Sequence, residues 1–478
     1  MNDENIIKLE NHPYDEIAVG DTAAFCKRLT KEDVALFAIM SGDVNPAHLD
    51  AKYAESTPFH EVIAHGMWGG ALISRLLGTQ LPGPGTLYLA QTLEFHRPVR
   101  IGDEIKFSVT VLEKQPRGHR VVLDCVACNL DGERVITGRA TVKAPTVKMV
   151  MDATPLPEFR VLDRKLLAGI LKQTEALPKL RAAVVHPVTA HVMLCIEAAI
   201  RQGVVAPTLV GPKERIEAAA RAAGVDLSGM PIVHTPHSHA AAERAVRMVA
   251  DGEMDTLIKG SLHTHELLEA VLDRKSGLRT DRRISHVYVF DVPTYERLLI
   301  ITDAAINIAP GLVEKVDIVK NAVGFAHAIG IAKPRVAILS AVETINPKIP
   351  STTEAAALCK MADRGQITGA ILDGPLAFDN AISAAAANIK GIVSEVAGQA
   401  DILVAPDLEA GNMVAKQLEY LADAAGAGLL LGARVPIVLT SRADQPETMA
   451  VSCALAALMD VRRKAAAADE HGEGEAHD

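Results

Sequence analysis

Residues 41–50 read "SGDVNPAHLD", a polar segment that follows the helix-like stretch "DVALFAIM" (33–40). Pro46 disfavours a helical conformation at the preceding residue, so the helix is expected to end near Gly42. The turn that follows can bring Asp43 and His48 to face one cavity, where a carboxylate and an imidazole could hold one water molecule and move its protons. The same residues also fit a plain turn in which Asp43 is a cap and His48 is exposed.

A second feature is the stretch "VIAHGMWGGALISRLLG" (62–78), which is apolar nearly all round and predicts a helix buried on most sides. "AHGM" opens it, so the Gly66 amide would be one of the free donors at the positive end of the helix dipole. Such a donor suits a thioester carbonyl that becomes an enolate oxygen. Four strand-like runs follow, at 85–99, 103–115, 119–130 and 133–144. A buried helix with an antiparallel sheet is an α+β arrangement.

Composition and charge exclude several classes of protein. The formal charge is −10 and no long Lys/Arg block occurs, so nucleic acid and acidic membrane surfaces are not expected partners. The N-terminus does not resemble a signal peptide, and no apolar run reaches the roughly 18 residues typical of a membrane helix. Cys125 and Cys128 lie in one strand-like run and should point to opposite faces. We therefore expect a cytoplasmic protein with unpaired thiols.

The character of the chain changes in "APTVKMVMDATPLPEF" (144–159), which contains three prolines. We expect a first domain at 1–145, a linker at 146–160, a second domain at 161–465 and a disordered acidic tail at 466–478. In the second domain strand-like and helix-like runs alternate, which predicts a two-lobed α/β domain with a doubly wound, mainly parallel sheet of about eight strands. The run 284–307 is expected to interrupt it with a hairpin.

Histidines are concentrated in "VHTPHSHAAAE" and "HTH" of the second domain, at His234, His237, His239, His263 and His265. Their spacing matches neither a Cys/His finger nor HExxH. They follow predicted strands, so loop and helix-cap positions are expected, and no metal site is predicted. Glycine-rich nucleotide-binding loops of the GxGxxG or Walker type are also missing from the sequence.

The D-x-N-P-x-H segment, the AHGM helix start and the strands after them resemble the MaoC-type (R)-specific enoyl-CoA hydratases of the hotdog fold, over about residues 15–145. The resemblance implies that Asp43 and His48 activate water and deliver a proton to the α-carbon, with Gly66 as the oxyanion donor. It leaves open which of the two groups removes the proton. Asn45 of the same segment is a candidate substrate-binding residue. A thioesterase is an alternative that these motifs fit less well.

Four landmarks in the second domain resemble the phosphate acetyltransferase/butyryltransferase family, over about residues 160–465. They are "TDAAINIAP" (302–310), "ILDGPLAFDNAIS" (371–383), "APDLEAGNM" (405–413) and "VLTSRADQ" (438–445). The family exchanges acyl groups between coenzyme A and inorganic phosphate without a covalent enzyme intermediate. Catalysis then depends on positioning and on groups that bind anions.

By this resemblance Ser441 and Arg442 match a Ser-Arg pair beside the CoA thiol and the acyl phosphate, while Asp379 and Asn412 fall in matching loops. An arginine next to a helix start is unfavourable for the dipole, so its presence there suits a bound anion. The acid that acetyl-type members carry seven residues after the serine is replaced by Thr448. Asp444 or Glu447 would have to serve instead.

An arginine of acetyl-type members aligns with Ala270, and Arg274 and Arg279 are the candidates to replace it. We therefore retain two hypotheses. The first is a bifunctional enoyl-CoA hydratase and phosphate acyltransferase. The alternative is a hydratase whose second domain is a non-catalytic module for acyl-CoA sensing or assembly. In either case the ligands are acyl-CoA and phosphate, no cofactor is expected, and both resemblances imply a homo-oligomer.

Overall fold

The computed structural model describes residues 8–154, 165–275, 278–439 and 445–474. The chain divides into two compact units, Met1–Val161 and Leu162–Asp478, and each is described by itself. Within the described ranges, every helix is too short or too polar to cross a membrane.

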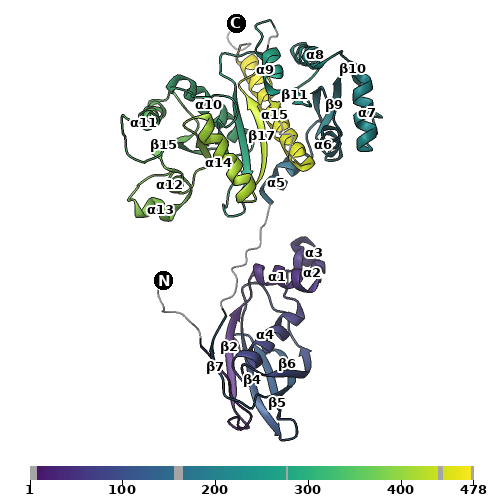
Figure 1. Ribbon diagram of the computed structural model, residues 1–478, viewed down its shortest axis with the longest axis vertical. Helices are drawn as coiled ribbons and strands as arrows, with labels where there is room; N and C mark the ends of the chain where they lie inside the picture. The colour runs from purple at the N-terminus through teal and green to yellow at the C-terminus, as the bar shows by residue number, and fades with distance from the viewer. Residues whose placement is uncertain (1–7, 155–164, 276–277, 440–444, 475–478) are drawn as a thin grey trace. The chain divides into compact units, whose positions relative to one another are not determined.

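The first unit is a five-stranded antiparallel sheet that packs against one long helix (Figure 1). The strand order is β2-β4-β5-β6-β3, and the long helix is α4 (Gly66–Thr79). This is the hotdog arrangement that the sequence predicted; β2 was not anticipated. The other elements are β2 (Thr22–Arg28), α1 (Lys31–Ser41), α2 (Pro46–Leu49), α3 (Ala51–Glu55), β3 (Leu87–Phe95), β4 (Glu104–Gln115), β5 (Arg120–Cys128) and β6 (Arg134–Lys143).

Alternation along the strands explains why this sheet covers α4. In β4 the residues Ile105, Phe107 and Val109 are buried, whereas the side chains between them are more exposed. In β5, Cys125 is buried and Cys128 is partly exposed, as expected for residues on opposite faces. The helix approaches the sheet closely because Gly69 faces Ile136, where any added Cβ would overlap the isoleucine side chain.

The boundary region between the units differs from the expected linker. β7 (Val150–Asp152) lies within residues 146–160 and pairs in antiparallel fashion with β1 (Lys8–Glu10). The side chain of Asn11 adds hydrogen bonds to Val147 and Met149. The start of the predicted linker is therefore an ordered part of the first unit, because backbone pairing with β1 satisfies its polar groups.

The second unit contains one continuous eleven-stranded sheet, with the order β10-β9-β8-β11-β18-β17-β12-β13-β16-β14-β15. Its strands are β8 (Leu180–Val185), β9 (Val205–Gly211), β10 (Ile232–His234), β11 (Thr256–Lys259), β12 (Ser285–Asp291), β13 (Leu299–Thr302), β14 (Arg335–Leu339), β15 (Ile371–Leu376), β16 (Ile402–Val404), β17 (Ala425–Leu431) and β18 (Ile437–Val438).

Parallel strands make up both ends of this sheet, and antiparallel pairs make up its centre. β10, β9, β8, β11 and β18 are parallel neighbours, as are β13, β16, β14 and β15. Between them β17 pairs antiparallel with β18 and β12, and β12 pairs antiparallel with β13. The predicted hairpin is thus confirmed as β12–β13, and the two parallel lobes share one sheet.

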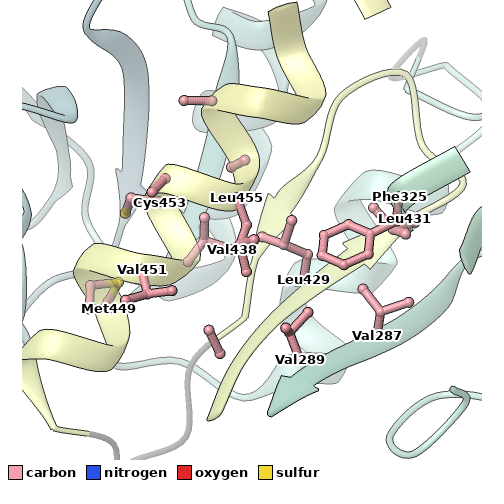
Figure 2. Packing of buried hydrophobic residues seen from close by; sticks show 14 of the residues in the cluster. Val287, Val289, Phe325, Leu429, Leu431, Val438, Met449, Val451, Cys453 and Leu455 are labelled. Carbon is pink, nitrogen blue, oxygen red and sulfur yellow. The ribbon is translucent and has the colours of Figure 1, made fainter. Parts of the chain in front are cut away.

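Helices cover each lobe, and the C-terminal helix lies between the lobes (Figure 1). α15 (Pro446–Gly474) packs against β17, and Val451 and Leu455 of the helix are buried in one cluster with Leu429 and Val289 (Figure 2). The remaining helices are α5 (Lys165–Thr174), α6 (Ala190–Arg201), α7 (Lys213–Ala223), α8 (Ser238–Ala250), α9 (Thr264–Leu272), α10 (Leu312–Ala328), α11 (Pro350–Asp363), α12 (Phe378–Ile382), α13 (Ala384–Ile389) and α14 (Leu408–Leu421).

The expected disordered tail at 466–478 is wrong for residues 466–474, because α15 continues to Gly474. The physical reason is local. The segment "KAAAADE" is rich in alanine, which has the highest helix propensity, so a helix that has started in the core can continue through it.

Candidate functional sites

The polar segment at 41–50 is a turn that follows the end of α1 near Gly42, as the sequence predicted. α1 ends at Gly42, whose φ of 74° is left-handed and whose amide donates to the Ala38 carbonyl. Asn45 caps α2 by accepting a hydrogen bond from the Ala47 amide at 3.1 Å, and Pro46 is the first helical residue. The Asn45 carboxamide oxygen therefore accepts a hydrogen bond from within the loop. This bond stabilises the conformation of the segment 41–50.

Asp43 and His48 are brought together, with His65 as a third member of the cluster. One ligand-type atom of each side chain lies within 4.8 Å of the others. The Nδ1 atom of His48 lies 2.9 Å from the Ile63 carbonyl oxygen. A carbonyl oxygen can only accept, so Nδ1 must carry the proton, and Nε2 of neutral His48 is the free basic atom. The arrangement leaves a carboxylate and an imidazole nitrogen available for acid–base chemistry.

His65 was not singled out in the sequence, although it directly precedes Gly66 in AHGM. It is 3% exposed, and its Nε2 lies 3.0 Å from the main-chain oxygen of Asp43. This bond ties the loop that carries Asp43 to the start of α4. The ring also lies against His48, with centroids 4.0 Å apart. The sequence did contain a signal for His65, because this histidine directly precedes the start of α4 and follows the segment that carries Asp43 and His48.

A cavity of about 320 Å³ opens beside these residues. Gly66, the first residue of α4, contributes to its wall, and its amide has no acceptor within the helix. A Cβ on Gly66 would lie 3.3 Å from the Phe95 ring, so a side chain here would narrow the space. The lining combines polar groups at one side with apolar side chains suited to an acyl chain: His48, Phe59, Ile63, Ala64, His65, Gly66, Trp68, Gly69, Phe95, His96, Arg97, Pro98, Val99, Val135 and Ile136.

Hydrogen bonding limits which atoms of the Asp43–His48–His65 cluster could bind a metal ion. The His48 and His65 rings are tilted to one another by 35°, and one nitrogen of each ring lies against a main-chain oxygen. A nitrogen that donates to a carbonyl oxygen carries a proton and cannot ligate a metal ion, so each ring offers one nitrogen at most. Acid–base use is the better match to this geometry.

In the second unit, two of the four family-like landmarks are held in contact. Asp303 is 2% exposed and accepts hydrogen bonds from the amides of Ala305, Ile306 and Asn307. Asn412 in α14 donates from Nδ2 to the Ala304 carbonyl at 3.1 Å. The loops 302–310 and 405–413 thus contact each other, and the hydrogen bond from the Asn412 side chain orients the 302–310 loop.

Asp379, at the start of α12, belongs to a different group. Its carboxylate lies 3.3 Å from Lys390, which also pairs with Glu343 at 3.1 Å. A hydrogen bond from the Asn380 amide, reinforced by Lys390, lowers the pKa of Asp379. Asp379 is therefore an exposed, ionised carboxylate, and the structure does not bring it into a common cavity with Arg279.

Arg279 lines a cleft of about 500 Å³, together with Arg282 and Arg283. Its backbone forms a β-bridge with Ala433 after β17. Arg283 is engaged by Glu314 at 3.3 Å, so part of the positive charge of the cleft is neutralised. Asp281, Glu314 and Asp317 also line the cleft, so its three arginines are matched by three acidic side chains. Ala270 and Lys275 border a separate groove between α8 and α9.

Ser441, Arg442 and Asp444 lie outside the described residues. Thr448, in the place of the acid of acetyl-type members, lies in the first turn of α15.

Of the five histidines, His237 and His263 are helix caps as predicted, whereas His234 ends strand β10 and His239 and His265 lie in the first turns of α8 and α9. His237 caps α8 by accepting from the Ala240 amide at 3.2 Å, and His234 accepts from the Lys213 amide at 3.3 Å. His263 is the cap residue of α9. Across the described ranges, the one candidate cluster of three metal-ligating side chains is Asp43–His48–His65.

Comparison with known proteins assigns both units. Residues 234–457 match the family model of phosphate acetyl/butaryl transferases, and residues 18–125 match that of the MaoC like domain. A phosphate acetyltransferase of Rhizobium meliloti is 61% identical over 271 residues, 57% of this chain and 85% of that protein. A branched-chain phosphotransacylase of Enterococcus faecalis is 29% identical with a TM-score of 0.53, covering 59% of this chain and 99% of that one.

An R-hydratase of Pseudomonas aeruginosa is 46% identical over 32% of this chain and 99% of its own, with a TM-score of 0.32. The chain therefore belongs to the phosphate acetyltransferase/butyryltransferase family of enzymes, with a MaoC-like hotdog domain preceding the transferase domain.

Proposed function

We propose that the first unit hydrates a 2-enoyl-CoA to the (R)-3-hydroxyacyl-CoA. The observation that carries this is that His48 and Gly66 line one cavity at the start of α4, and that the Asp43 carboxylate lies within 4.8 Å of a His48 ring nitrogen. Hydration needs a base for water, an acid for the α-carbon and a donor for the enolate oxygen. These three groups supply all three needs.

In this mechanism the thioester oxygen accepts a hydrogen bond from the Gly66 amide at the positive end of α4. Water held between Asp43 and His48 loses a proton as its oxygen bonds to C3, and the negative charge moves onto the thioester oxygen. The C2 atom then takes a proton from the same acid–base pair. Nε2 of His48 is the free nitrogen because Nδ1 is bound to the Ile63 carbonyl.

The assay is the loss of enoyl absorbance with crotonyl-CoA and the purified full chain, followed together with a thiol reagent. Hydration removes the absorbance without releasing thiol, whereas a thioesterase releases thiol. Free thiol at the rate of absorbance loss would refute the proposal. Chiral analysis of the product tests the (R) configuration separately.

We propose that the second unit transfers acyl groups between coenzyme A and phosphate: acyl-CoA + phosphate ⇌ acyl phosphate + CoA. In the direction that forms acyl-CoA, the CoA thiolate attacks the acyl carbon of the acyl phosphate. The bond between that carbon and the phosphate oxygen breaks, and phosphate leaves. The support is the family membership together with the paired loops at Asp303 and Asn412. Ser441 and Arg442 are assigned to the thiol and the acyl phosphate by the family-like motif.

One observation favours the alternative of a non-catalytic second unit. Thr448 cannot act as the acid or base that acetyl-type members place there. Arsenolysis decides between the two, because an active enzyme converts acetyl-CoA or butyryl-CoA with arsenate into free CoA and the carboxylate. Steady CoA release from the full chain supports transfer. Binding of acyl-CoA without release would support the sensing module.

We also propose that the hotdog unit associates with a second copy through β3. This strand ends the sheet, so one edge of its backbone is unpaired within the described part of the unit. Its side chains include Leu87, exposed by 58%, Leu89 by 48% and Phe95 by 51%. Pairing of two β3 edges would cover this apolar surface next to the cavity wall that Phe95 forms.

A further inference from the structure

A second charged groove lies in the transferase unit, next to the cleft of Arg279. It has a volume of about 610 Å³, and we call it the arginine groove after Arg282, Arg434, Arg462 and Arg463. Its walls come from the segment before β12, the turn between β17 and β18, α10 and α15. None of the four family-like landmarks contributes a described residue to its lining.

The walls of the arginine groove are fixed by hydrogen bonds between segments far apart in sequence. The Arg434 amide donates to the Leu278 carbonyl at 3.0 Å, and the Thr280 hydroxyl donates to the Gly432 carbonyl at 2.5 Å. Asn321 of α10 donates to the Arg283 carbonyl at 2.9 Å. Gly432 has a φ of +92° and packs directly on the Arg283 backbone, where a side chain would overlap. The groove is therefore a preformed feature of the fold.

Two of the arginines are oriented by neighbouring side chains. Arg462 donates from Nη2 to His327 Nδ1 at 3.2 Å, while His327 Nε2 donates to the Gly369 carbonyl at 2.7 Å. Arg463 pairs with Asp460 at 2.6 Å. The Arg462 guanidinium is thus held by a neutral acceptor and retains its full charge.

The balance of charge in the arginine groove is positive. Among the described residues that line it, Asp281 is the single acidic side chain against four arginines. Asp460 beside the groove offsets the charge of Arg463. Met459 and Ala433 add apolar surface between the guanidinium groups. Arginines recognise phosphate oxygens through paired donors, and their combination with an apolar surface suits a flat base that carries phosphates.

We propose that the arginine groove is a binding site for an adenosine phosphate, with the phosphates on Arg434, Arg462 and Arg282 and the base against Met459. Two sources offer this chemistry: a free nucleotide, and the 3′-phosphoadenosine diphosphate portion of coenzyme A. The proposal does not depend on the assignment of the acyl-transfer reaction, because binding is measured directly.

The test is calorimetric titration of the full chain with ATP, with adenosine 3′,5′-bisphosphate and with tripolyphosphate, at low ionic strength. The test variant is the double substitution Arg434→Gln with Arg462→Gln. The matched control is Arg221→Gln, an exposed arginine on α7 in the other lobe. We expect at least a tenfold loss of affinity in the double variant and no change in the control. Arg462→Lys keeps the charge but loses the planar guanidinium, and should give a smaller loss.

The three ligands distinguish the sources. Preference for ATP assigns the groove to a free nucleotide, and preference for the bisphosphate assigns it to the coenzyme A portion. Equal affinity for tripolyphosphate would overturn the role of the nucleoside. Undiminished binding in the double variant, or no binding of any ligand to the native protein at millimolar concentration, would overturn the proposal. Far-UV circular dichroism and the thermal midpoint confirm that each variant is folded.

Discussion

His286, the second residue of β12, should make the second unit sensitive to acid. Its side chain is fully buried, and neither ring nitrogen has a hydrogen-bond partner among the described residues. The ring packs edge-on to Tyr288, with centroids 4.3 Å apart, and occupies space left by Gly428. Burial is the main cause of a lowered pKa of about 4 for His286; nearby Asp303 opposes the shift and Lys416 adds to it.

The direction of the pH dependence of stability follows from proton binding by His286 in the folded and unfolded states. Between about pH 6.5 and about pH 4 the unfolded chain protonates this histidine and the folded chain does not. The stabilisation is therefore fully present above about pH 6.5 and is lost as the pH falls towards 4. At about 1.4 kcal/mol per pKa unit, the loss attributable to His286 is on the order of 3 kcal/mol.

The perturbation is His286→Leu, an apolar residue that cannot be protonated. We expect a constant loss of stability from the changed packing, but a weaker dependence on pH than in the native protein. His186, whose pKa is also lowered by burial, contributes to both proteins and cancels in the comparison.

Urea titrations at pH 7.5, 6.5, 5.5 and 4.5 measure the effect. The chain has one tryptophan, Trp68 in the first unit, so its fluorescence reports that unit while far-UV circular dichroism reports both. The variant should alter the circular dichroism transition and leave the fluorescence transition unchanged. Parallel pH profiles for the native protein and the variant would refute the reasoning.

Four further predictions concern the proposed sites and surface. Asp43→Asn and His48→Ala should each reduce hydration by about 100-fold or more, the usual contribution of an acid–base group, and near-normal rates would remove them from the mechanism. Arg442→Gln should abolish acyl transfer and leave hydration intact; loss of both activities would instead indicate misfolding. Gly411→Ala should impair transfer, because its Cβ would lie 2.5 Å from the Asp303 carbonyl oxygen; unchanged arsenolysis and thermal midpoint would contradict this. Leu89→Lys should lower the molar mass measured by light scattering, and an unchanged mass would exclude β3 as an interface.

Local sequence was sufficient for the features that depend on neighbouring residues. The D-x-N-P-x-H segment predicted the end of α1, because Pro46 and Gly42 act on the backbone next to them. Strand-like runs separated by Gly and Asp turns predicted four of the five strands of the hotdog sheet, and Gly66 was correctly placed at the start of α4. Strand–helix alternation likewise predicted the α/β class of the second unit and its β12–β13 hairpin.

Contacts between distant residues were not predictable in the same way. The sequence of the edge strand β2, "TAAFCKR", does not alternate between apolar and polar residues, and its place is decided by pairing with β4. The pairing of β7 with β1 converts part of an apparent linker into sheet. The packing of α15 in the core joins residues about 170 positions apart in the chain, as Val287 and Leu455 illustrate.

The sequence by itself determined the two families, the start of α4 at Gly66, and the cap positions of His237 and His263, because motifs and turn residues act over a few positions. Only the tertiary structure decided that His65 holds the Asp43 loop, that Asn412 orients the loop at Ala304, and that four arginines from separate segments share a groove. These depend on which segments pack together. That choice is made by burial and backbone pairing over the whole chain, and it is not encoded in any short stretch.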